Sequence, residues 1–373
     1  MGHLDKSSSS SSKGKDVLLI TTELLTGQIS HLLNDLHERH PEIKVEIVTK
    51  DTPLESFSQE TLKATKYLLG FTNFPRPEQV PNLKYVQIFS AGSNHLHNNP
   101  LWKHEDDVIW CSASGVHGPI IAEYVVMAIL AHCHRYFSAV HQFQGVGHWP
   151  KDWPRNIPPQ REVYRQTIGI VGYGAIGRNT ARLLTGFNVD VITLNSTKKS
   201  TKEERRQKEE YTVPGTGDIL GDIPVRWYAS TDPQEKKKFF EESDVVVVTA
   251  PYTPATKHLV DAAALSQMKE TSLIVNIARG ELIDQEALIK VLKEKKIAGA
   301  ALDVTTPEPY PADGELLTKL GSTEDRERLI MTPHISGHTP DYNRRVVAIL
   351  EENLDRYKSG KTMLNVIDRK KGY

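Results

Sequence analysis

The feature that most constrains this chain is a glycine-rich turn between an apolar strand and an amphipathic helix. The strand pattern Ile168–Val171 leads directly into GYGAIG at residues 172–177, and a helical pattern follows at once. In that setting the first glycine makes a tight turn, the second lets the backbone approach a pyrophosphate, and the third lets the helix pack on the strand. N–H groups at the start of the helix favour an anion. The expected pyrophosphate contacts are Gly172, Gly174, Ala175, Ile176 and Gly177. The turn therefore predicts a dinucleotide-binding α/β domain.

The rest of the chain repeats this alternation of short β-branched runs and helical patterns. The strand patterns of the first third are Val17–Thr21, Val45–Val48, Tyr67–Phe71, Tyr85–Phe89 and Val108–Trp110. The later strand patterns are Ile168–Val171, Val189–Leu194, Val245–Val248, Leu273–Asn276, Ala298–Leu302 and Leu329–Met331. Helices are expected after Pro119 and over Tyr342–Leu354. Strands that alternate with helices indicate parallel sheets with crossover connections, here two doubly wound α/β domains.

Chain length and changes in composition suggest where the domains begin and end. The 373 residues suit two domains with elaborations. We expect residues 16–135 and 341–373 to form one domain, and residues 136–340 to form the dinucleotide-binding domain. Residues 1–15, with six consecutive serines, are expected to be a flexible tail. The long polar and charged stretch 198–234 is expected to be a surface insertion.

Composition excludes several classes of protein. Lys and Arg (46) balance Asp and Glu (47), which argues against a protein that coats nucleic acid or is drawn to a membrane. Two cysteines exclude a disulfide scaffold and suit a reducing compartment. The longest apolar run, Val125–Ala131, is too short to span a bilayer, and the polar start lacks a signal-peptide core. His132 and His134 point to different faces of a predicted helix, so no metal site is expected. A cytoplasmic protein with neither nucleic acid nor membrane as partner is expected.

The end of the second strand of the dinucleotide-binding domain indicates which dinucleotide is bound. NAD enzymes place a carboxylate there to bind both ribose hydroxyls. This chain has Asn195, followed by Ser196, Thr197 and Lys198. A carboxylate would repel a 2′-phosphate, whereas an amide, two hydroxyls and a lysine would attract one. These residues predict NADP as the preferred cofactor and NAD as the alternative; the lysine could equally just begin the solvated insertion.

Three further motifs place polar side chains after apolar strands, at the sheet edge where ligands bind in open α/β folds. They are NIARGELID (276–284), GAALDV followed by PEP (299–309), and TPHISG (332–337). With GYGAIG (172–177), SAG (90–92) and APYTPAT (250–256), they resemble the D-isomer-specific 2-hydroxyacid dehydrogenases, which include glyoxylate and hydroxypyruvate reductases. The resemblance covers residues from about 60 to 373. It implies a Rossmann NAD(P)-binding domain inserted in a flavodoxin-like substrate domain, without a regulatory domain.

The resemblance also implies a reaction and assigns residues to it. A hydride would pass between NADP or NAD and a 2-oxo acid or its D-2-hydroxy acid. Arg279 would hold the substrate, His334 would be the general acid that protonates the carbonyl oxygen, and Glu308 would hold the imidazole. The backbone expected to bind the substrate carboxylate belongs to Ala91, Gly92 and Ser93. Further cofactor contacts are expected from Ala250, Pro251, Thr256, Ile277, Ala278, Asp303 and Gly337.

Some features leave alternatives open. The same family includes nicotinamide-binding corepressors that keep the three catalytic residues, so a scaffold role is the alternative to an enzyme. An enzyme acting on a non-carbon acid such as phosphite is a third possibility. His95, His117 and His338 could contact a small anionic substrate or be exposed loop residues. The resemblance also implies an active site between the domains, and a homodimer built around the helix after Pro119.

Overall fold

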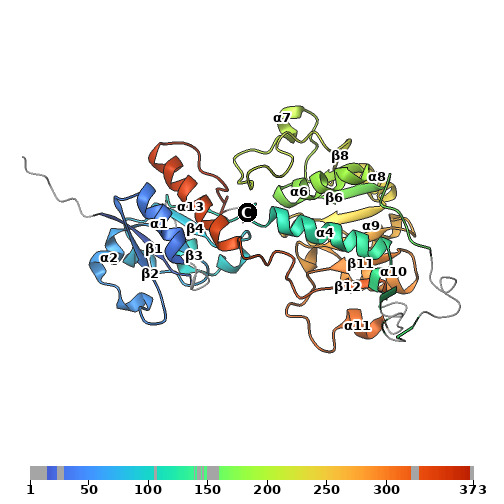
Figure 1. The fold of residues 1–373 in the computed structure, drawn as a ribbon, viewed down its shortest axis with the longest axis horizontal. Coiled ribbons are helices and arrows are strands. Elements are labelled where there is room, and N and C mark those ends of the chain that lie inside the picture. The colour runs from blue at the N-terminus through green and yellow to red at the C-terminus, as the bar shows by residue number, and fades with distance from the viewer. Residues whose placement is uncertain are drawn as a thin grey trace, which may run out of the picture. The chain divides into compact units, whose positions relative to one another are not determined.

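The structure is a computed structural model that describes residues 15–22, 29–104, 107–137, 139–140, 144, 147–148, 159–320 and 327–369. The chain divides into two compact units (Figure 1). Unit 1 comprises Met1–Ala113 and Asn343–Tyr373, and unit 2 comprises Ser114–Tyr342. Unit 2 is therefore continuous in sequence, and unit 1 is built from the segments before and after it. Residues 1–14 of the expected tail lie outside the described residues.

Unit 1 is built on a parallel sheet of five strands with the order β2-β1-β3-β4-β5. Its strands are β1 (Asp16–Ile20), β2 (Ile43–Ile47), β3 (Thr65–Gly70), β4 (Tyr85–Ile88) and β5 (Ile109–Cys111). Its helices are α1 (Ile29–Arg39), α2 (Gln59–Ala64), α3 (Pro100–Lys103) and α13 (Tyr342–Lys358), the last starting at the unit boundary. Short 3₁₀ turns are η2 (Leu54–Ser56), η3 (Pro77–Gln79) and η4 (Asn94–Leu96). This strand order is that of flavodoxin-like folds, which confirms the predicted architecture.

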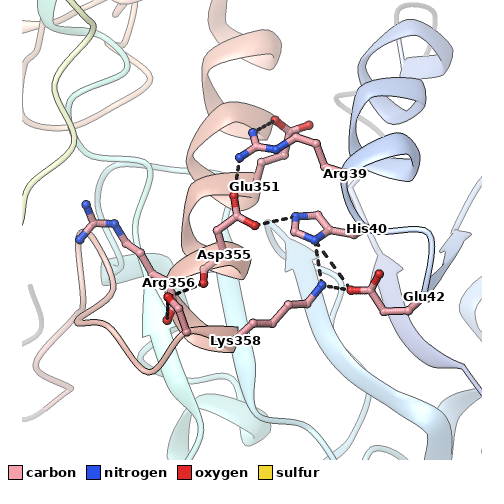
Figure 2. Close-up of polar contacts among 8 residues, drawn as sticks. Arg39, His40, Glu42, Glu351, Asp355, Arg356 and Lys358 are labelled. Atoms are coloured by element: carbon pink, nitrogen blue, oxygen red, sulfur yellow. Dashed lines mark hydrogen bonds and ion pairs between the residues drawn. The ribbon is translucent and has the colours of Figure 1, made fainter.

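A network of charged side chains joins the end of α1 to α13 within unit 1 (Figure 2). Arg39 donates to Glu351 at 3.0 Å and also pairs with Asp355. The His40 side chain is only 2% exposed, and its Nδ1 accepts a hydrogen bond from Lys358 Nζ at 2.8 Å. Burial, and then the neighbouring ammonium of Lys358, lower the pKa of His40. Protonation of His40 therefore destabilises the contacts between the end of α1 and α13.

Unit 2 is built on a parallel sheet of seven strands with the order β12-β11-β10-β9-β6-β7-β8. Its strands are β6 (Thr167–Val171), β7 (Asp190–Asn195), β8 (Arg226–Ala229), β9 (Val245–Val248), β10 (Leu273–Asn276), β11 (Gly299–Leu302) and β12 (Leu329–Met331). Its helices are α4 (Gly118–Cys133), α6 (Ala175–Leu184), α7 (Lys202–Arg205), α8 (Pro233–Glu242), α9 (Ala262–Gln267), α10 (Gln285–Lys293) and α11 (Glu315–Lys319), with 3₁₀ turns η5 (Thr185–Phe187) and η6 (Gly280–Leu282). The order is that of a Rossmann sheet with one added edge strand, as predicted.

The core of unit 2 follows from the apolar character of its central strands. All four valines of β9 are buried, as are all four residues of β10 and of β11. Continuous apolar strands suit a parallel sheet that is covered on both faces. Because the chain passes from β6 to β7 on one side and later to β9 on the other, the loops after β6 and β9 lie next to each other. That point is where a doubly wound sheet binds its ligand.

The first domain boundary differs from the predicted one. We expected residues up to 135 to belong to the first domain, but α4 belongs to unit 2. The apolar side chains that place it there are Ile121, Val125 and Ile129, which share one core with Ile168 and Ile170 of β6. The apolar pattern of α4 predicted a buried helix correctly but could not show which sheet buries it.

The expected surface insertion 198–234 is largely part of the folded unit. β8 lies within it and pairs in parallel with β7 at the edge of the sheet, where Tyr228 and Ala229 are buried. Asp218 is also buried, and α8 begins at Pro233. The prediction missed β8 because the strand is only four residues long and the polar stretch 230–234 follows it.

His132, near the end of α4, is a partly buried histidine with three arginines near it. Its ring lies against Gly299, where an added Cβ would be 2.6 Å from Cε1. Burial, and then the charges of Arg135, Arg161 and Arg328, lower the pKa of His132 to about 4. His132 is therefore neutral near pH 7 and acts as a packing residue.

The described part of the chain carries no membrane-spanning helix and no cluster of metal ligands. Within it, no helix combines the length and apolar character needed to cross a membrane. Among the same residues, no three His, Cys, Asp or Glu side chains gather in a group that could hold a metal ion. Cys111 and Cys133 are buried, free cysteines.

Candidate active site

The glycine turn has the geometry that a bound dinucleotide requires. Gly172 has a φ of +88°, and an added Cβ there would lie 2.7 Å from the Cα of Ala250. A Cβ on Gly177 would lie 2.6 Å from the carbonyl oxygen of Gly172. No described atom lies within 4 Å of a Cβ built on Gly174. The first and third glycines are therefore required by the fold, whereas the second borders space that a pyrophosphate fits.

The N-terminus of α6 faces the same place. The helix begins at Ala175 with Gly174 as its N-cap, and this glycine has no side chain that could accept hydrogen bonds from the first N–H groups. Ala175, Ile176 and Gly177 thus present the first N–H groups of a ten-residue helix. These groups and the helix dipole favour an anion, as the sequence predicted.

Asn195 ends β7 beside the glycine turn. Its Oδ1 accepts a hydrogen bond from the backbone N–H of Tyr173 at 3.1 Å, and its Nδ2 donates to Thr193 Oγ1 at 3.1 Å. Ser196 and Thr197 follow as exposed residues. The predicted ribose-reading residues therefore lie at the strand end next to the pyrophosphate position.

Lys198 is engaged differently from the expectation. It was expected to attract a 2′-phosphate, but its ammonium pairs with Glu235 in the first turn of α8. The ion pair neutralises the lysine, although 61% of its side chain remains exposed. An exposed ion pair of this kind is weak, so the expected contact of Lys198 with a 2′-phosphate stays a prediction.

The loop after β9 is tied to the glycine turn. Thr249 Oγ1 donates to the carbonyl oxygen of Gly172 at 2.5 Å, and Ala250 is buried against the same glycine. Thr256 Oγ1 donates to the carbonyl oxygen of Pro251 at 2.8 Å, so its hydroxyl closes its own loop. Ala250, Pro251 and Thr256 thus belong to the loop that meets the glycine turn, and their contacts with a cofactor stay a prediction.

The loops after β10, β11 and β12 carry the predicted catalytic residues and contact one another. Arg279 follows β10, and a Cβ on Gly280 would lie 2.2 Å from the carbonyl carbon of Thr305. The N–H of Thr305 donates to Glu308 Oε1 at 3.0 Å. Glu308 Oε2 in turn bonds to His334 Nδ1 at 2.9 Å. The structure therefore brings the loops of Arg279, Glu308 and His334 together at the carboxyl edge of the sheet.

The Glu308–His334 pair fixes the chemistry of the imidazole. An ionised carboxylate only accepts hydrogen bonds, so Nδ1 carries the hydrogen and Nε2 is left to exchange a proton with a ligand. The side chains of His334 and Glu308 are 49% and 35% exposed. The pair is thus accessible to a ligand and suited to general acid–base catalysis.

Asp303 holds the loop that carries His334. Its buried carboxylate accepts hydrogen bonds from Thr332 Oγ1 at 2.6 Å and from the N–H groups of Ile335 and Ser336, both at 2.9 Å. Its carbonyl oxygen accepts the N–H of His334 at 2.9 Å. His334 has a φ of +54°, which is uncommon outside glycine. These hydrogen bonds show that Asp303 fixes the loop of His334. Its expected contact with the nicotinamide stays a prediction.

Arg279 is held by its own loop. Asn276 Nδ2 donates to the carbonyl oxygen of Arg279 at 2.9 Å, and Asn276 Oδ1 accepts the N–H of Ala278 at 3.1 Å. Arg279 Nη1 donates to the carbonyl oxygen of Ala278 at 2.6 Å. Among the described residues, this is the one hydrogen bond that the Arg279 side chain donates. The other N–H groups of the guanidinium can therefore bind a carboxylate. Ile277 is buried and Ala278 partly exposed, next to the expected cofactor position.

The expected substrate-carboxylate loop belongs to unit 1. Ala91 is exposed, Ser93 is buried, and Gly92 is partly exposed and accepts a hydrogen bond from Ser90 Oγ at 2.8 Å. His95 bonds through Nε2 to the carbonyl oxygen of Phe71 at 3.0 Å. The contacts of this loop with a substrate stay a prediction.

Gly337 and His338 follow His334 in the sequence, and His117 contacts the same loop. A Cβ on Gly337 would lie 2.7 Å from Cδ2 of His117, whose ring centroid is 4.7 Å from that of Tyr342. His338 is exposed. His117 is therefore packed on the loop of the general acid, and the expected cofactor contact of Gly337 stays a prediction.

Sequence reasoning missed one residue that supports the site. The hydroxyl of Tyr124 on α4 is hydrogen-bonded to Thr332 Oγ1 at 2.6 Å, and the Thr332 hydroxyl donates to Asp303. Burial raises the pKa of Tyr124. Thr332 was visible in the TPHISG motif, but no signal indicated Tyr124, because its partner lies 208 residues away.

Comparison with known proteins gives the family. The model of the "D-isomer specific 2-hydroxyacid dehydrogenase, NAD binding domain" matches residues 126–218 and 227–336. A glyoxylate reductase of Thermofilum pendens is 31% identical over 277 residues, which cover 74% of this chain and 72% of the relative.

Two solved structures share the fold. A D-isomer-specific 2-hydroxyacid dehydrogenase of Xanthobacter autotrophicus, in complex with NADPH and MES, has a TM-score of 0.72 at 24% identity and covers 96% of this chain and 100% of its own. An NADPH-dependent glyoxylate/hydroxypyruvate reductase of Sinorhizobium meliloti, in complex with NADP and sulfate, has a TM-score of 0.69 at 22% identity, with the same coverage. The chain is therefore a member of the D-isomer-specific 2-hydroxyacid dehydrogenase family.

Proposed function

We propose that the protein is an NAD(P)-dependent reductase of small 2-oxo acids that forms D-2-hydroxy acids. The observation that carries this proposal is the Glu308–His334 pair, joined at 2.9 Å and accessible beside the loop of Arg279. A cation with free N–H donors next to a proton donor suits an anionic substrate with an adjacent carbonyl. The relative named glyoxylate reductase in Thermofilum pendens supports the same class of substrate.

Each catalytic residue has a separate task. Arg279 binds the substrate carboxylate and orients the carbonyl through its planar fork of N–H donors. His334 donates a proton from Nε2 to the carbonyl oxygen as that oxygen gains charge, and accepts it back in the oxidative direction. Glu308 keeps the imidazole in the tautomer and orientation that this transfer needs, and Asp303 keeps the loop in place.

The dinucleotide fits the glycine turn, the start of α6 and the end of β7. When bound, it supplies the hydride chemistry of the reaction. We favour NADP because Asn195 stands where NAD enzymes use a carboxylate, and because Ser196 and Thr197 expose hydroxyls beside it. Lys198 would add to this preference only by leaving Glu235.

The surface of α4 supports a homodimer. Within α4 the one Asp, Glu, Lys or Arg is the exposed Glu123, and Met127 is 45% exposed at the surface of the helix. Ile120, Tyr124 and Leu130 are partly exposed at the border of the core against which the helix packs. A helix of this kind at a surface is typical of an interface between subunits.

One panel of rate measurements tests the proposed function. Oxidation of NADPH and of NADH would be followed with glyoxylate, hydroxypyruvate, phenylpyruvate and 2-ketoisocaproate. His334→Gln is the control, since a contaminating reductase would be unaffected by it. We expect turnover of at least one acid that the variant largely loses. Cofactor binding with no turnover of any acid would contradict the proposal and favour the scaffold role. Turnover that survives in the variant would also contradict the proposal, because His334 would then not be the general acid.

A further inference from the structure

We propose that Asp218 and Tyr173 are positioning residues for the dinucleotide. The segment 199–223, which includes Asp218, folds over α6 and holds the glycine turn through Tyr173; we call it the clamp segment. By fixing the turn before the cofactor arrives, it sets cofactor affinity. The inference rests on the proposed function, since it concerns the same dinucleotide site.

Tyr173 lies between the first two glycines of the turn and points into the clamp segment. Its side chain is 5% exposed, and its hydroxyl donates to Asp218 Oδ2 at 2.8 Å. Burial first, and Asp218 second, raise the pKa of Tyr173, so the phenol stays protonated and remains a donor. The turn is therefore anchored by a side chain of its own to a carboxylate 45 residues away.

Asp218 is itself rigidly placed. Its Oδ1 accepts the N–H groups of Gly221 at 3.0 Å and Asp222 at 3.2 Å, and its Oδ2 also accepts the N–H of Ile223 at 3.1 Å. A carboxylate that holds three backbone N–H groups of a tight turn cannot rotate freely. Asp218 thus offers Tyr173 a fixed acceptor.

A buried arginine joins the clamp segment to α6. Arg178, in the first turns of α6, is 5% exposed, and its guanidinium lies 4.9 Å from the centroid of the Tyr173 ring. It donates to the carbonyl oxygen of Asp218 at 2.5 Å and to that of Arg205 at 2.6 Å. Two carbonyl oxygens and an aromatic face offset part of the cost of burying this charge, although burial still lowers the pKa of Arg178. The contact covers the outside of the dinucleotide-binding helix.

The same tyrosine connects the clamp to the ribose position. Its backbone N–H donates to Asn195 Oδ1 at 3.1 Å, while its ring meets the ring of Trp227 edge-on at 5.1 Å. Tyr173 is therefore held at the backbone by the residue predicted to read the ribose, and at the side chain by Asp218 and Trp227. Movement of its side chain would change the pyrophosphate and ribose positions together.

The middle of the clamp segment is anchored as well. Gly115 has a φ of +91°, and a Cβ there would lie 2.0 Å from the carbonyl oxygen of Tyr211. Arg182 of α6 donates to the carbonyl oxygen of Gly217 at 3.1 Å. The segment is thus fixed at several points of unit 2, as a device that transmits rigidity must be.

The test compares Tyr173→Phe with a matched control, Tyr228→Phe. The first change removes only the hydroxyl bonded to Asp218. The second removes a hydroxyl bonded to Glu242 of α8 at 2.9 Å. Tyr228 lies on the face of the sheet opposite to Trp227, and so away from the Tyr173 ring. For each protein, the Kd of NADPH and of NADH is measured by direct fluorescence titration, kcat and KM by steady-state rates, and Tm by thermal unfolding.

We expect Tyr173→Phe to raise the Kd and KM of the dinucleotide about three- to ten-fold. This is less than the full effect of losing one hydrogen bond to an ionised acceptor, because the lost bond holds the turn and does not itself contact the cofactor. Because ordering of the turn is completed on binding, kcat at saturating cofactor should stay within about twofold of the wild type. Asp218→Asn, which offers fewer acceptors to the same donors, should raise Kd at least as much.

Three results would overturn the inference. The first is an unchanged Kd in Tyr173→Phe and in Asp218→Asn, and the second is an equal rise in Tyr228→Phe. The third is a fall in kcat without a change in Kd. If the wild type binds neither dinucleotide, the proposed function fails and this inference fails with it. If the wild type binds and the Tyr173 variant binds equally well, only the inference fails.

Discussion

Replacement of Glu308 by glutamine tests the catalytic pair with a change of very small size. Both carboxylate oxygens of Glu308 accept: Oε1 from the N–H of Thr305 at 3.0 Å and Oε2 from His334 Nδ1 at 2.9 Å. A glutamine amide has one acceptor oxygen and one donor group. Glu308→Gln must therefore turn an N–H₂ group toward one of the two donors. Either the imidazole loses its partner, or the loop that positions the partner is disturbed.

The size of the effect follows from the loss of one hydrogen bond to an ionised group, about 1.5–3 kcal/mol when shielded. The side chains of His334 and Glu308 are 49% and 35% exposed, so water competes for the bond. A discounted loss of about 1–2 kcal/mol in the transition state remains, which corresponds to a roughly 5- to 30-fold fall in kcat/KM. Cofactor affinity should not change, because neither oxygen contacts the glycine turn.

The assay is the steady-state oxidation of NADPH with the best 2-oxo acid of the panel, together with Tm. Glu241→Gln is the matched control, since that residue makes the same chemical change in an exposed pair with Lys237 on α8. The control should keep the wild-type kcat/KM. Activity of Glu308→Gln within twofold of the wild type, at unchanged Tm, would show that the carboxylate does not support the general acid.

Four further outcomes are expected. His334→Gln should lower kcat by on the order of 10² or more as the general acid is lost, measured in the same assay; near-normal rates would mean that another group supplies the proton. Asn195→Asp should shift the ratio of kcat/KM values toward NADH, because a carboxylate repels a 2′-phosphate; an unchanged ratio would place ribose recognition elsewhere. The pKa of His132 is lowered from 6.5 to about 4. The stability given by its neutral form is therefore complete above about pH 6.5 and lost as pH falls toward 4, by up to about 3 kcal/mol. The Tm of His132→Gln, measured by thermal unfolding, should accordingly fall less between about pH 7 and pH 5 than the Tm of the wild type. Equal falls in Tm would contradict this. Met127→Arg should convert a dimer to monomers in light scattering after gel filtration, and a dimer that survives would exclude the outward face of α4 as the interface.

Much of the site could be predicted from the sequence because its residues stand in short motifs. The turn GYGAIG requires glycine at 172 and 177 for steric reasons that hold for any strand–helix junction of this kind. Glu308 and His334 each follow an apolar strand, and parallel strands end at one edge of the sheet. The two α/β architectures likewise follow from the alternation of strands and helices, which is a local property of the chain.

Only the tertiary structure decided the contacts between segments that are distant in sequence. The burial of α4 against β6, the pairing of β8 at the sheet edge, and the bond from Tyr173 to Asp218 all join residues far apart in the chain. Lys198 has a sequence position that suits phosphate binding, yet in the structure its ammonium pairs with Glu235 of α8. Local sequence determines which elements form and which chemical groups end each strand. Which partner a side chain meets depends on the folding of the whole unit, because burial and charge pairing are properties of three-dimensional neighbourhoods.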